Sequence, residues 1–492
     1  MAAAQQQHPR DRWIDQEVAA DRYKWWALLV VQLSILLIGI DSTITNLALP
    51  SITSEFKVSV ASSQWVIAVF FVVVALALPA AGRISDIRGR KTVFVVGFSL
   101  FAMGSALSGL APNIGMLIAM RALQAVGAAA LLANSNVISL AVFPLRQHGL
   151  ALGINGTVYS VGFALGFTLG GILIQLLGWR SIFFVNVPIA LASLLVGCWI
   201  LRSDQLEPEQ KTAGPQRFDL PGFALASIGV GGLMLGVQHF AKEQSLSTLT
   251  VGLTSAGLAG LLGFIWVELK QSHPLIDVRL FRIGEFARGS GTRLLNNTIV
   301  AACLFAIPFF TQTVLHFNSL QSGLVMLPYS LGLAVAGPIA GHLSDRFGPR
   351  WLTTLGFITG GVALLWLNSI GHGPGSMNQD SMLVIIKVVG AMLLLGSASG
   401  LFVSPNNSAS LDAVPLARTG TASGVIWALS FIGSAVGTAY AAAMLRQALH
   451  GQIEASIYLK AQDTLFASLV ALSVLGGVLC YTRARGPKST IS

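Results

Sequence analysis

The chain has 492 residues, of which 54% are hydrophobic and only 10% are charged. Soluble globular domains carry about 25% charged residues. The composition therefore excludes a soluble protein and predicts an all-α integral membrane protein. The formal net charge of +10 would fit a nucleic-acid partner, but the positions of the basic residues explain it differently.

Apolar runs long enough to cross a bilayer recur along the whole chain. A helix needs about 20 predominantly apolar residues to span the hydrocarbon core. Fourteen segments meet this condition, which predicts 14 transmembrane helices with both termini on one side. The predicted spans are 25–47, 63–82, 92–111, 115–140, 149–177, 181–201, 220–239, 247–268, 288–315, 322–342, 351–371, 381–404, 419–446 and 463–482.

The basic residues are distributed unevenly between the two sides of these spans. If both termini are cytoplasmic, 23 of the 30 Lys and Arg residues lie on that side and 5 lie on the other. The cytoplasmic set includes Arg288 and Arg293 at the start of the ninth span. Because cytoplasmic loops carry an excess of Lys and Arg, this bias predicts cytoplasmic termini. It also accounts for the net charge without a nucleic-acid partner.

A loop motif occurs twice, as 82–91 after the second span and as 341–350 after the tenth, at an offset of 259 residues. Internal duplication is typical of transporters that alternate access around a central site. The repeat predicts two pseudo-symmetric six-helix bundles with two inserted helices between them. The predicted order is a cytoplasmic segment 1–24, an N-terminal bundle 25–202, a linker 203–219, an inserted pair 220–270, a linker 271–287, a C-terminal bundle 288–482 and a tail 483–492.

The repeated loop predicts a conformational latch. Asp86 can cap the next helix, or pair with Arg90 or with an arginine of the other half. Such a charge cluster would hold the cytoplasmic face in one state and release it in the other. The alternative is that the loop only fixes topology. The candidate latch residues are Gly82, Asp86, Gly89, Arg90 and Asp345.

Asp41 is the only carboxylate deep inside a predicted span. Ionisable residues at bilayer depth are costly and usually mark a proton or ligand pathway, although Asp41 could instead cap a helix or pair with an arginine. Arg121 lies at a similar depth, since Asp41 is about 12 Å and Arg121 about 9 Å from the outer end of its predicted span. A close Arg121 would hold Asp41 ionised, and a distant one would favour its protonation. The alternative is a static pair that only orders two helices.

Polar and aromatic residues inside the spans are candidates for a substrate cavity. Each of them could instead bond a neighbouring helix. The candidates are Asn46, Gln124, Asn134, Tyr159, Asn297, Gln312 and Trp427. No metal or cofactor site is predicted, and no nucleophile constellation points to an enzyme.

Three segments resemble a known family. Segment 82–91 resembles the loop 2–3 signature of the major facilitator superfamily, and segment 41–50 resembles the span 1 motif of its fourteen-span drug:proton antiporters. Segment 121–127 is similar to the basic motif that the family assigns to proton transfer. The resemblance implies the major facilitator fold and proton-driven export of amphipathic drugs or lipophilic cations across a bacterial inner membrane. It implies Asp41 and Arg121 as the coupling residues.

The resemblance further implies a monomer in the lipid bilayer whose partners are protons and a small amphipathic substrate, with no nucleic acid. A preference for monovalent lipophilic cations or neutral amphiphiles over divalent cations follows from Asp41 as the one deep negative charge. The alternatives are a proton-linked exporter or flippase of an endogenous lipid or metabolite, and a non-transporting receptor. Span 5 departs from the family motif, because Phe167 stands where a proline is usual. It keeps a face of small residues for close helix packing, namely Gly162, Gly166, Gly170 and Gly171.

Overall fold

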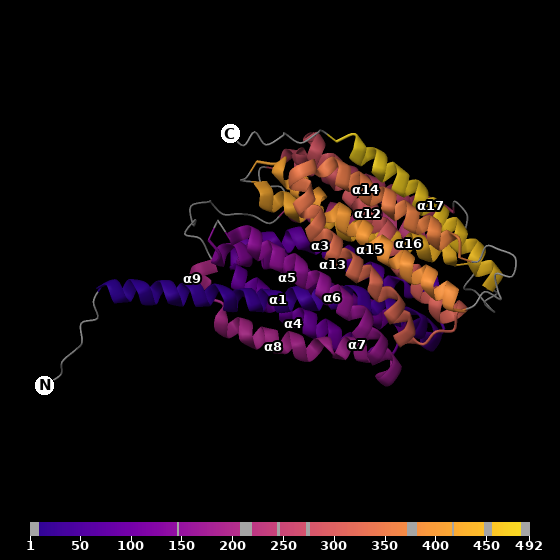
Figure 1. Ribbon diagram of the computed structural model, residues 1–492, viewed down its shortest axis with the longest axis horizontal. Helices are drawn as coiled ribbons and strands as arrows, with labels where there is room; N and C mark the ends of the chain where they lie inside the picture. The colour runs from indigo at the N-terminus through magenta and orange to yellow at the C-terminus, as the bar shows by residue number, and fades with distance from the viewer. Residues whose placement is uncertain are drawn as a thin grey trace.

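The computed structural model describes residues 9–144, 147–206, 219–243, 247–271, 276–370, 381–415, 418–446 and 455–483. All regular elements in these ranges are helices, which run along a common direction in one bundle (Figure 1). Thirteen of the helices described there are long and apolar enough to cross a membrane. The remaining predicted span, 220–239, contains a shorter apolar helix over Leu220–Gly236. The predicted all-α membrane fold is confirmed.

The helices extend beyond the apolar runs, because polar ends continue the helical backbone past the bilayer core. The first group comprises α1 (Pro9–Phe56), α2 (Val60–Ser63), α3 (Trp65–Arg88), α4 (Arg90–Gly109), α5 (Ile114–Val142), α6 (His148–Leu177), α7 (Ser181–Phe184) and α8 (Asn186–Ile200). Between the groups lie α9 (Ser203–Leu206), α10 (Leu220–Glu243), α11 (Thr248–Lys270) and η2 (Val278–Arg282). The second group comprises α12 (Gly284–Phe309), the π-helical η3 (Phe310–Val314), α13 (Ser319–Phe347), α14 (Pro349–Asn368), α15 (Ser381–Asp412), α16 (Thr419–Leu445) and α17 (Ala455–Tyr481).

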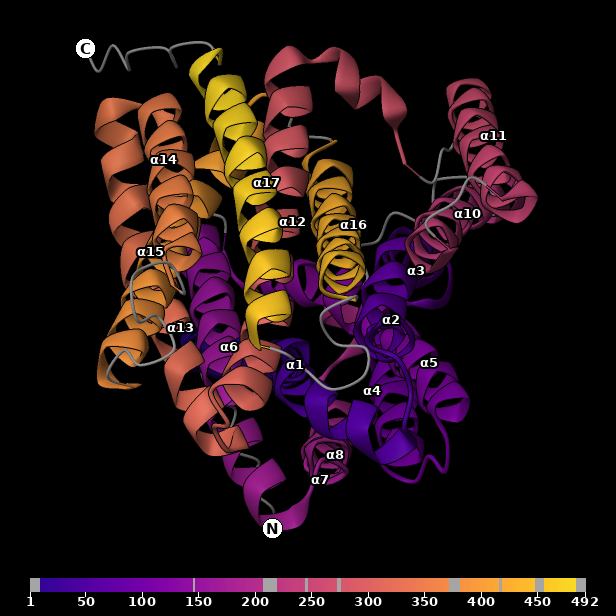
Figure 2. The same ribbon diagram turned by 90° about the vertical axis from the view of Figure 1, so that its right-hand side faces the viewer.

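The two groups share one packing pattern. In the first, α1 packs against α5, α6 and α8, α3 packs against α5, and α4 packs against α5 and α8. In the second, α12 packs against α15, α16 and α17, α13 against α15, and α14 against α15 and α17. These pairs correspond when α1, α3, α4, α5, α6 and α8 are matched in order to α12 through α17. The helices α10 and α11 pack on each other at the edge, beside α3 and α16 (Figure 2).

The groups meet through α6 with α13 and through α3 with α16, which are equivalent pairs under the same matching. Near the Leu177 end of α6 the backbones touch. A Cβ on Gly171 would lie 2.8 Å from the Leu320 Cα, and a Cβ on Gly323 would lie 2.4 Å from the Phe167 carbonyl oxygen. The Gln312 Nε2 also donates to the Leu47 carbonyl oxygen at 3.1 Å. This end of the interface is closed.

The opposite end of the interface, where the basic loops lie, is open. Residues three, four and seven positions apart share a face of a helix. Gly424 and Gly420 thus share a face of α16 with Trp427, and Gly156 shares a face of α6 with Tyr159. A Cβ on any of these three glycines would meet nothing within 4 Å. The two groups therefore separate on the basic side of the Tyr159–Trp427 contact.

Small residues let α1 and α6 approach closely. A Cβ on Gly162 would lie 2.6 Å from the Leu36 carbonyl oxygen, and one on Gly166 would lie 2.6 Å from that of Ile40. Gly170 faces α1 as well, whereas Gly171 faces α13 of the other group. The four predicted packing glycines thus serve two interfaces. Phe167, at the position of the usual proline, is fully buried within an uninterrupted α6.

The α1–α6 contact predicts opposite outcomes for two alanine substitutions in α6. Gly166→Ala forces a methyl group into the backbone of α1, and overpacking of this kind costs about 1–3 kcal/mol. Gly156→Ala adds the same group on a face where its Cβ meets nothing within 4 Å. Thermal unfolding in detergent should show a lower Tm for Gly166→Ala and an unchanged Tm for Gly156→Ala. Equal Tm values would contradict this packing.

Candidate functional site

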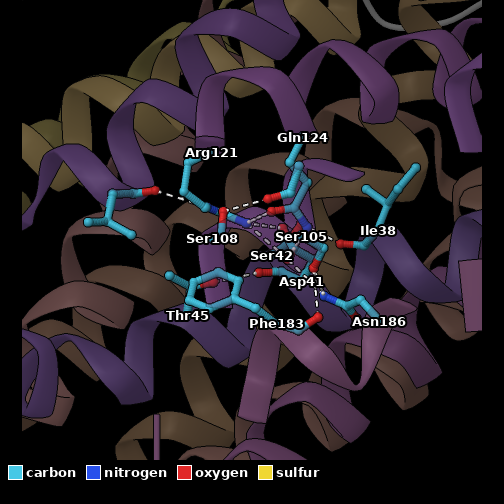
Figure 3. Close-up of polar contacts among 12 residues, drawn as sticks. Ile38, Asp41, Ser42, Thr45, Ser105, Ser108, Arg121, Gln124, Phe183 and Asn186 are labelled. Carbon is cyan, nitrogen blue, oxygen red and sulfur yellow. Dashed lines mark hydrogen bonds and ion pairs between the residues drawn. The ribbon is translucent and has the colours of Figure 1, made fainter. Parts of the chain in front are cut away.

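Asp41 lies at the centre of a fully buried polar network in the first group (Figure 3). The Arg121 Nη1 donates to both carboxylate oxygens, at 2.8 Å and 3.0 Å. The Gln124 Nε2 donates to the Asp41 Oδ1 at 2.9 Å, and the Asn186 Nδ2 donates to the same oxygen at 3.2 Å. The network joins α1, α5 and α8, and the structure therefore brings the two sequence-predicted coupling residues into direct contact.

Arg121 is fixed from several directions. Its Nε donates to the Val66 carbonyl oxygen at 3.1 Å, and its Nη1 also donates to the Gln124 Oε1 at 2.7 Å. The guanidinium lies over the Phe70 ring, 4.4 Å from the ring centroid. It is 1% exposed and Asp41 is 0% exposed. Removing two charges from water costs several kcal/mol per ion, and only close geometry with further hydrogen bonds offsets this.

Asn186 belongs to the site although sequence reasoning did not select it. Its only sequence signal is that it is a single amide within the apolar run 181–201. The side chain is 0% exposed, and its Oδ1 is buried without a hydrogen-bond partner. A buried acceptor beside a carboxylate suits a protonated Asp41, which would need an acceptor for its new O–H.

The network constrains how Asp41 can take up a proton. Both carboxylate oxygens of Asp41 already accept hydrogen bonds. A proton on either oxygen must therefore displace or reorient one of the donor groups. The Asp41 Oδ2 accepts from the Arg121 Nη1, and a proton there competes directly with the guanidinium. Protonation of Asp41 therefore requires a rearrangement of this hydrogen-bond network.

Helix α1 reaches the interface between the two groups at Ser42, the residue after Asp41. The Tyr159 phenol interacts with the Ser42 side chain. The Tyr159 and Trp427 ring centroids are 5.9 Å apart, and those of Phe163 and Tyr329 are also 5.9 Å apart. We call the rings that meet here the central aromatic cluster, which comprises Tyr159, Phe163, Tyr329, Trp427 and Phe431. Helix α1 thus connects the buried ion pair with this cluster.

The predicted cavity candidates separate into different places. Gln124 lies in the Asp41 network rather than at the interface. Asn134 donates to the Ser85 hydroxyl at 2.8 Å and ties α5 to α3. Asn46 bonds the backbone of its own helix through the Ser42 carbonyl oxygen. These three bond other groups of the protein, which is the structural alternative considered from the sequence.

Of the other four candidates, three lie at the interface between the groups, and Asn297 bonds the backbone of its own helix. Tyr159 and Trp427 are in the central aromatic cluster. Gln312 links the groups at the closed end. The Asn297 Nδ2 donates to the Arg293 carbonyl oxygen at 2.9 Å, one turn along α12.

The repeated loops share a backbone turn. Gly89 has φ +93° and Gly348 has φ +79°, a left-handed region that favours glycine. The Asp86 Oδ1 and the Arg90 Nη2 are 3.4 Å apart in a largely exposed pair. Gly89, rather than Asp86, is the N-cap of α4, without a side-chain hydrogen bond. Gly82 faces open space, and the side chain of Asp345 lies outside the described residues.

Arg293, which was counted from the sequence on the cytoplasmic side at the start of the ninth span, lies well inside α12. It is the tenth residue of α12 and is 7% exposed. The apolar run was placed correctly, but the helix begins at Gly284 and carries Arg293 into the bundle. Other buried carboxylates among the described residues are Asp219 and Glu268, which lie at the basic-side ends of α10 and α11.

A double-mutant cycle tests the Asp41–Arg121 contact. Arg121→Gln leaves a buried carboxylate without its cation, which should cost about 3–5 kcal/mol of stability. In an Asp41→Asn background the same change should cost less, with an interaction energy of about 1–3 kcal/mol. Unfolding in mixed micelles, followed by tryptophan fluorescence, gives all four free energies. Additive losses would show that the two side chains do not interact.

Comparisons with known proteins agree with this architecture. The model of the Major Facilitator Superfamily matches residues 32–438. The multidrug resistance protein Stp of Mycobacterium tuberculosis is 32% identical over 436 residues, which cover 88% of this chain and 78% of that protein. The riboflavin transporter RibZ of Clostridioides difficile is 29% identical over 435 residues, covering 87% and 90%.

A solved structure shares the fold. It is that of a bacterial homologue of the human lysosomal transporter Spinster, in an inward-facing and unoccupied conformation. It matches with a TM-score of 0.64 at 17% identity and covers 93% of this chain and 96% of that one. With the family match over most of the sequence, the chain belongs to the Major Facilitator Superfamily and is a multi-pass membrane transporter rather than an enzyme.

Proposed function

We propose that the chain is a proton-coupled secondary transporter that exports amphipathic compounds by alternating access. The observation that carries this proposal is the buried Asp41–Arg121 pair, 2.8 Å apart and inaccessible to water. An ionisable residue at this depth is a functional-site hypothesis by default. The similarity to a multidrug resistance protein supports the direction and the substrate class.

The coupling follows from the position of the pair. In the proposed cycle, the rearrangement that protonates Asp41 shifts α1 against α5, and α1 also interacts with Tyr159 through Ser42. A shift of α1 therefore changes the interface through which the two groups open and close. A proton can bias an equilibrium only by binding one state better than the other, and the difference in the Asp41 environment supplies that bias.

The expected preference for monovalent lipophilic cations or neutral amphiphiles over divalent cations loses its support. It rested on Asp41 as a free negative charge for the substrate. Asp41 is instead enclosed with Arg121, Gln124 and Asn186, and all four are at most 1% exposed. We therefore keep amphipathic compounds as the substrate class without a preference for cations.

An exporter of an endogenous metabolite or lipid is the second candidate, favoured by the similarity to a riboflavin transporter. Both candidates use the same coupling site. We further propose a bacterial inner-membrane location with cytoplasmic termini, a monomer, and no nucleic-acid partner. The basic loops at the open end support this orientation, because positive loops face the cytoplasm. The conformation described here would then be open to the cytoplasm.

Replacing the carboxylate tests the coupling role directly. Asp41→Asn removes the titrating group but keeps an oxygen that accepts from Arg121, so the fold should persist. In proteoliposomes with an imposed pH gradient, the variant should show no substrate accumulation above equilibrium, while exchange between substrate pools on the two sides continues. Asp412→Asn, an exposed carboxylate at the end of α15, is the control and should accumulate substrate normally. Gradient-driven accumulation by Asp41→Asn would show that Asp41 is not the proton carrier.

The loop pair predicts a different defect. Asp86→Ala should lower the turnover rate several-fold and leave equilibrium substrate affinity unchanged. The reason is that an exposed loop pair acts on the conformational equilibrium rather than on the bound substrate. Asp412→Ala removes a carboxylate from the same face and serves as the control. A large loss of affinity at unchanged turnover would contradict the latch role.

A further inference from the structure

Arg293 is a buried cation for which the proposed transport cycle has no use so far. Its Nε donates to the Ser430 hydroxyl at 2.7 Å. Its Nη1 is buried and has no hydrogen-bond partner. A buried charge without a counter-ion costs several kcal/mol, so its presence at 7% exposure calls for a physical reason.

Two other arginines show how this chain neutralises buried guanidinium groups. Arg121 is bound to Asp41. Arg483 donates to the Glu285 Oε2 at 3.0 Å and to the Asn406 Oδ1 at 2.6 Å. Among the residues that the structure describes, no carboxylate pairs with Arg293. The titratable groups that interact with it electrostatically are the phenols of Tyr159 and Tyr329.

These neighbours place Arg293 beside the central aromatic cluster. Tyr159 comes from the first group and Tyr329 from the second, so the guanidinium lies where both groups meet α12. Ser430, its hydrogen-bond partner, follows Trp427 by three residues and precedes Phe431. The Trp427 and Phe431 rings stack with their centroids 6.0 Å apart. A positive charge therefore lies next to aromatic walls supplied by both groups.

The central aromatic cluster lies where the open space on the basic side of the interface begins. Gly424 and Gly420, on the Trp427 face of α16, would each accept a Cβ with nothing within 4 Å. The aromatic rings and Arg293 therefore lie next to open space on the basic side. Asp41, the deep negative charge, is enclosed on the other side of α1 and is 0% exposed.

We propose that Arg293 binds an anionic group of an amphipathic substrate, such as a carboxylate, sulfonate or phosphate, whose apolar part packs on Tyr159, Tyr329 and Trp427. The planar guanidinium matches such oxyanions with parallel hydrogen bonds, and its partnerless Nη1 supplies a donor. A purely structural Arg293 would need only the bond to Ser430, which a neutral side chain can make. The inference rests on the proposed function, because it specifies the substrate class of that transporter.

Equilibrium binding to the purified protein in nanodiscs tests the proposal without a proton gradient. The probes are three aryl amphiphiles with the same apolar part and a carboxylate, a primary amide or a trimethylammonium head. The carboxylate should bind roughly 10- to 100-fold more tightly than the amide, since hydrogen bonds to charged groups are the stronger class. Arg293→Gln should remove this preference, and Arg293→Lys should restore part of it.

Arg282→Gln removes the same charge from an exposed position in η2 and should leave the head-group preference unchanged. Size-exclusion profiles and Tm values show whether each variant is folded. If Arg293→Gln does not fold, the head-group preferences of the wild-type protein and of Arg293→Lys still test the proposal. Tightest binding of the trimethylammonium probe, equal binding of carboxylate and amide, or an anion preference that survives Arg293→Gln would each overturn the proposal.

Nanodisc composition separates the two sources of such a group. Loss of carboxylate-probe binding in phosphatidylglycerol, relative to phosphatidylcholine, assigns the site to anionic lipid headgroups. Equal binding in both assigns it to free anionic amphiphiles. The outcome is independent of proton coupling. Asp41→Asn can abolish gradient-driven transport while the anion preference persists. If instead the anion preference is absent but Asp41→Asn abolishes gradient-driven transport, coupling stands and the substrate class is different.

Discussion

Two opposite charges removed from water form the constraint on which the rest of this structure depends. Asp41 and Arg121 are both enclosed, so neither can exchange its partner for solvent while the first group keeps its present packing. The cost of the two buried charges is offset only by close geometry and by the amide donors of Gln124 and Asn186. Any step that protonates Asp41 must first alter this geometry. The chemistry of the proton is thereby tied to the positions of helices.

The packing of α1 carries this constraint to the place where the two groups move against each other. Gly162 and Gly166 hold α6 against the α1 backbone, and Ser42 meets Tyr159 one residue beyond Asp41. Packed interfaces shift between discrete arrangements rather than deforming continuously. A small change in α1 can therefore select between closed and open arrangements at the central aromatic cluster. The repeated pairs, α6 with α13 and α3 with α16, give the motion its two-fold character.

Charge is divided between two places in this architecture. The ion pair in the first group is neutral as a unit, and Arg293 beside the cluster carries an uncompensated positive charge among the described residues. The proposed transporter would separate the proton from the substrate. In that proposal the proton acts on a closed network, and the substrate meets aromatic rings and a guanidinium at the interface. The two ligands then communicate through helix α1 and the interface rather than by competing for one carboxylate.

Hydropathy and the loop repeat were enough to predict the all-helical fold and the positions of the helices, because span length and loop charge are set by the bilayer. Depth along the spans also predicted that Asp41 and Arg121 can meet. The direction in which each side chain points from its helix could not be predicted in the same way. The Asn186 amide points at Asp41, and Gln124 belongs to the ion pair rather than to the interface. Arg293 was counted at the cytoplasmic start of its span because an apolar run does not show where its helix begins.

The central claim is that the protonation state of Asp41 sets the opening of the interface. Spin labels at Gly153→Cys in α6 and Gly420→Cys in α16, in a background with the exposed Cys198 replaced, report the separation of the two groups at the open end. Pulsed electron paramagnetic resonance should show a distance distribution that changes with pH when Asp41 is present. In the Asp41→Asn background the distribution should be the same at every pH. A distribution that follows pH in Asp41→Asn as it does with the native residue would contradict the account.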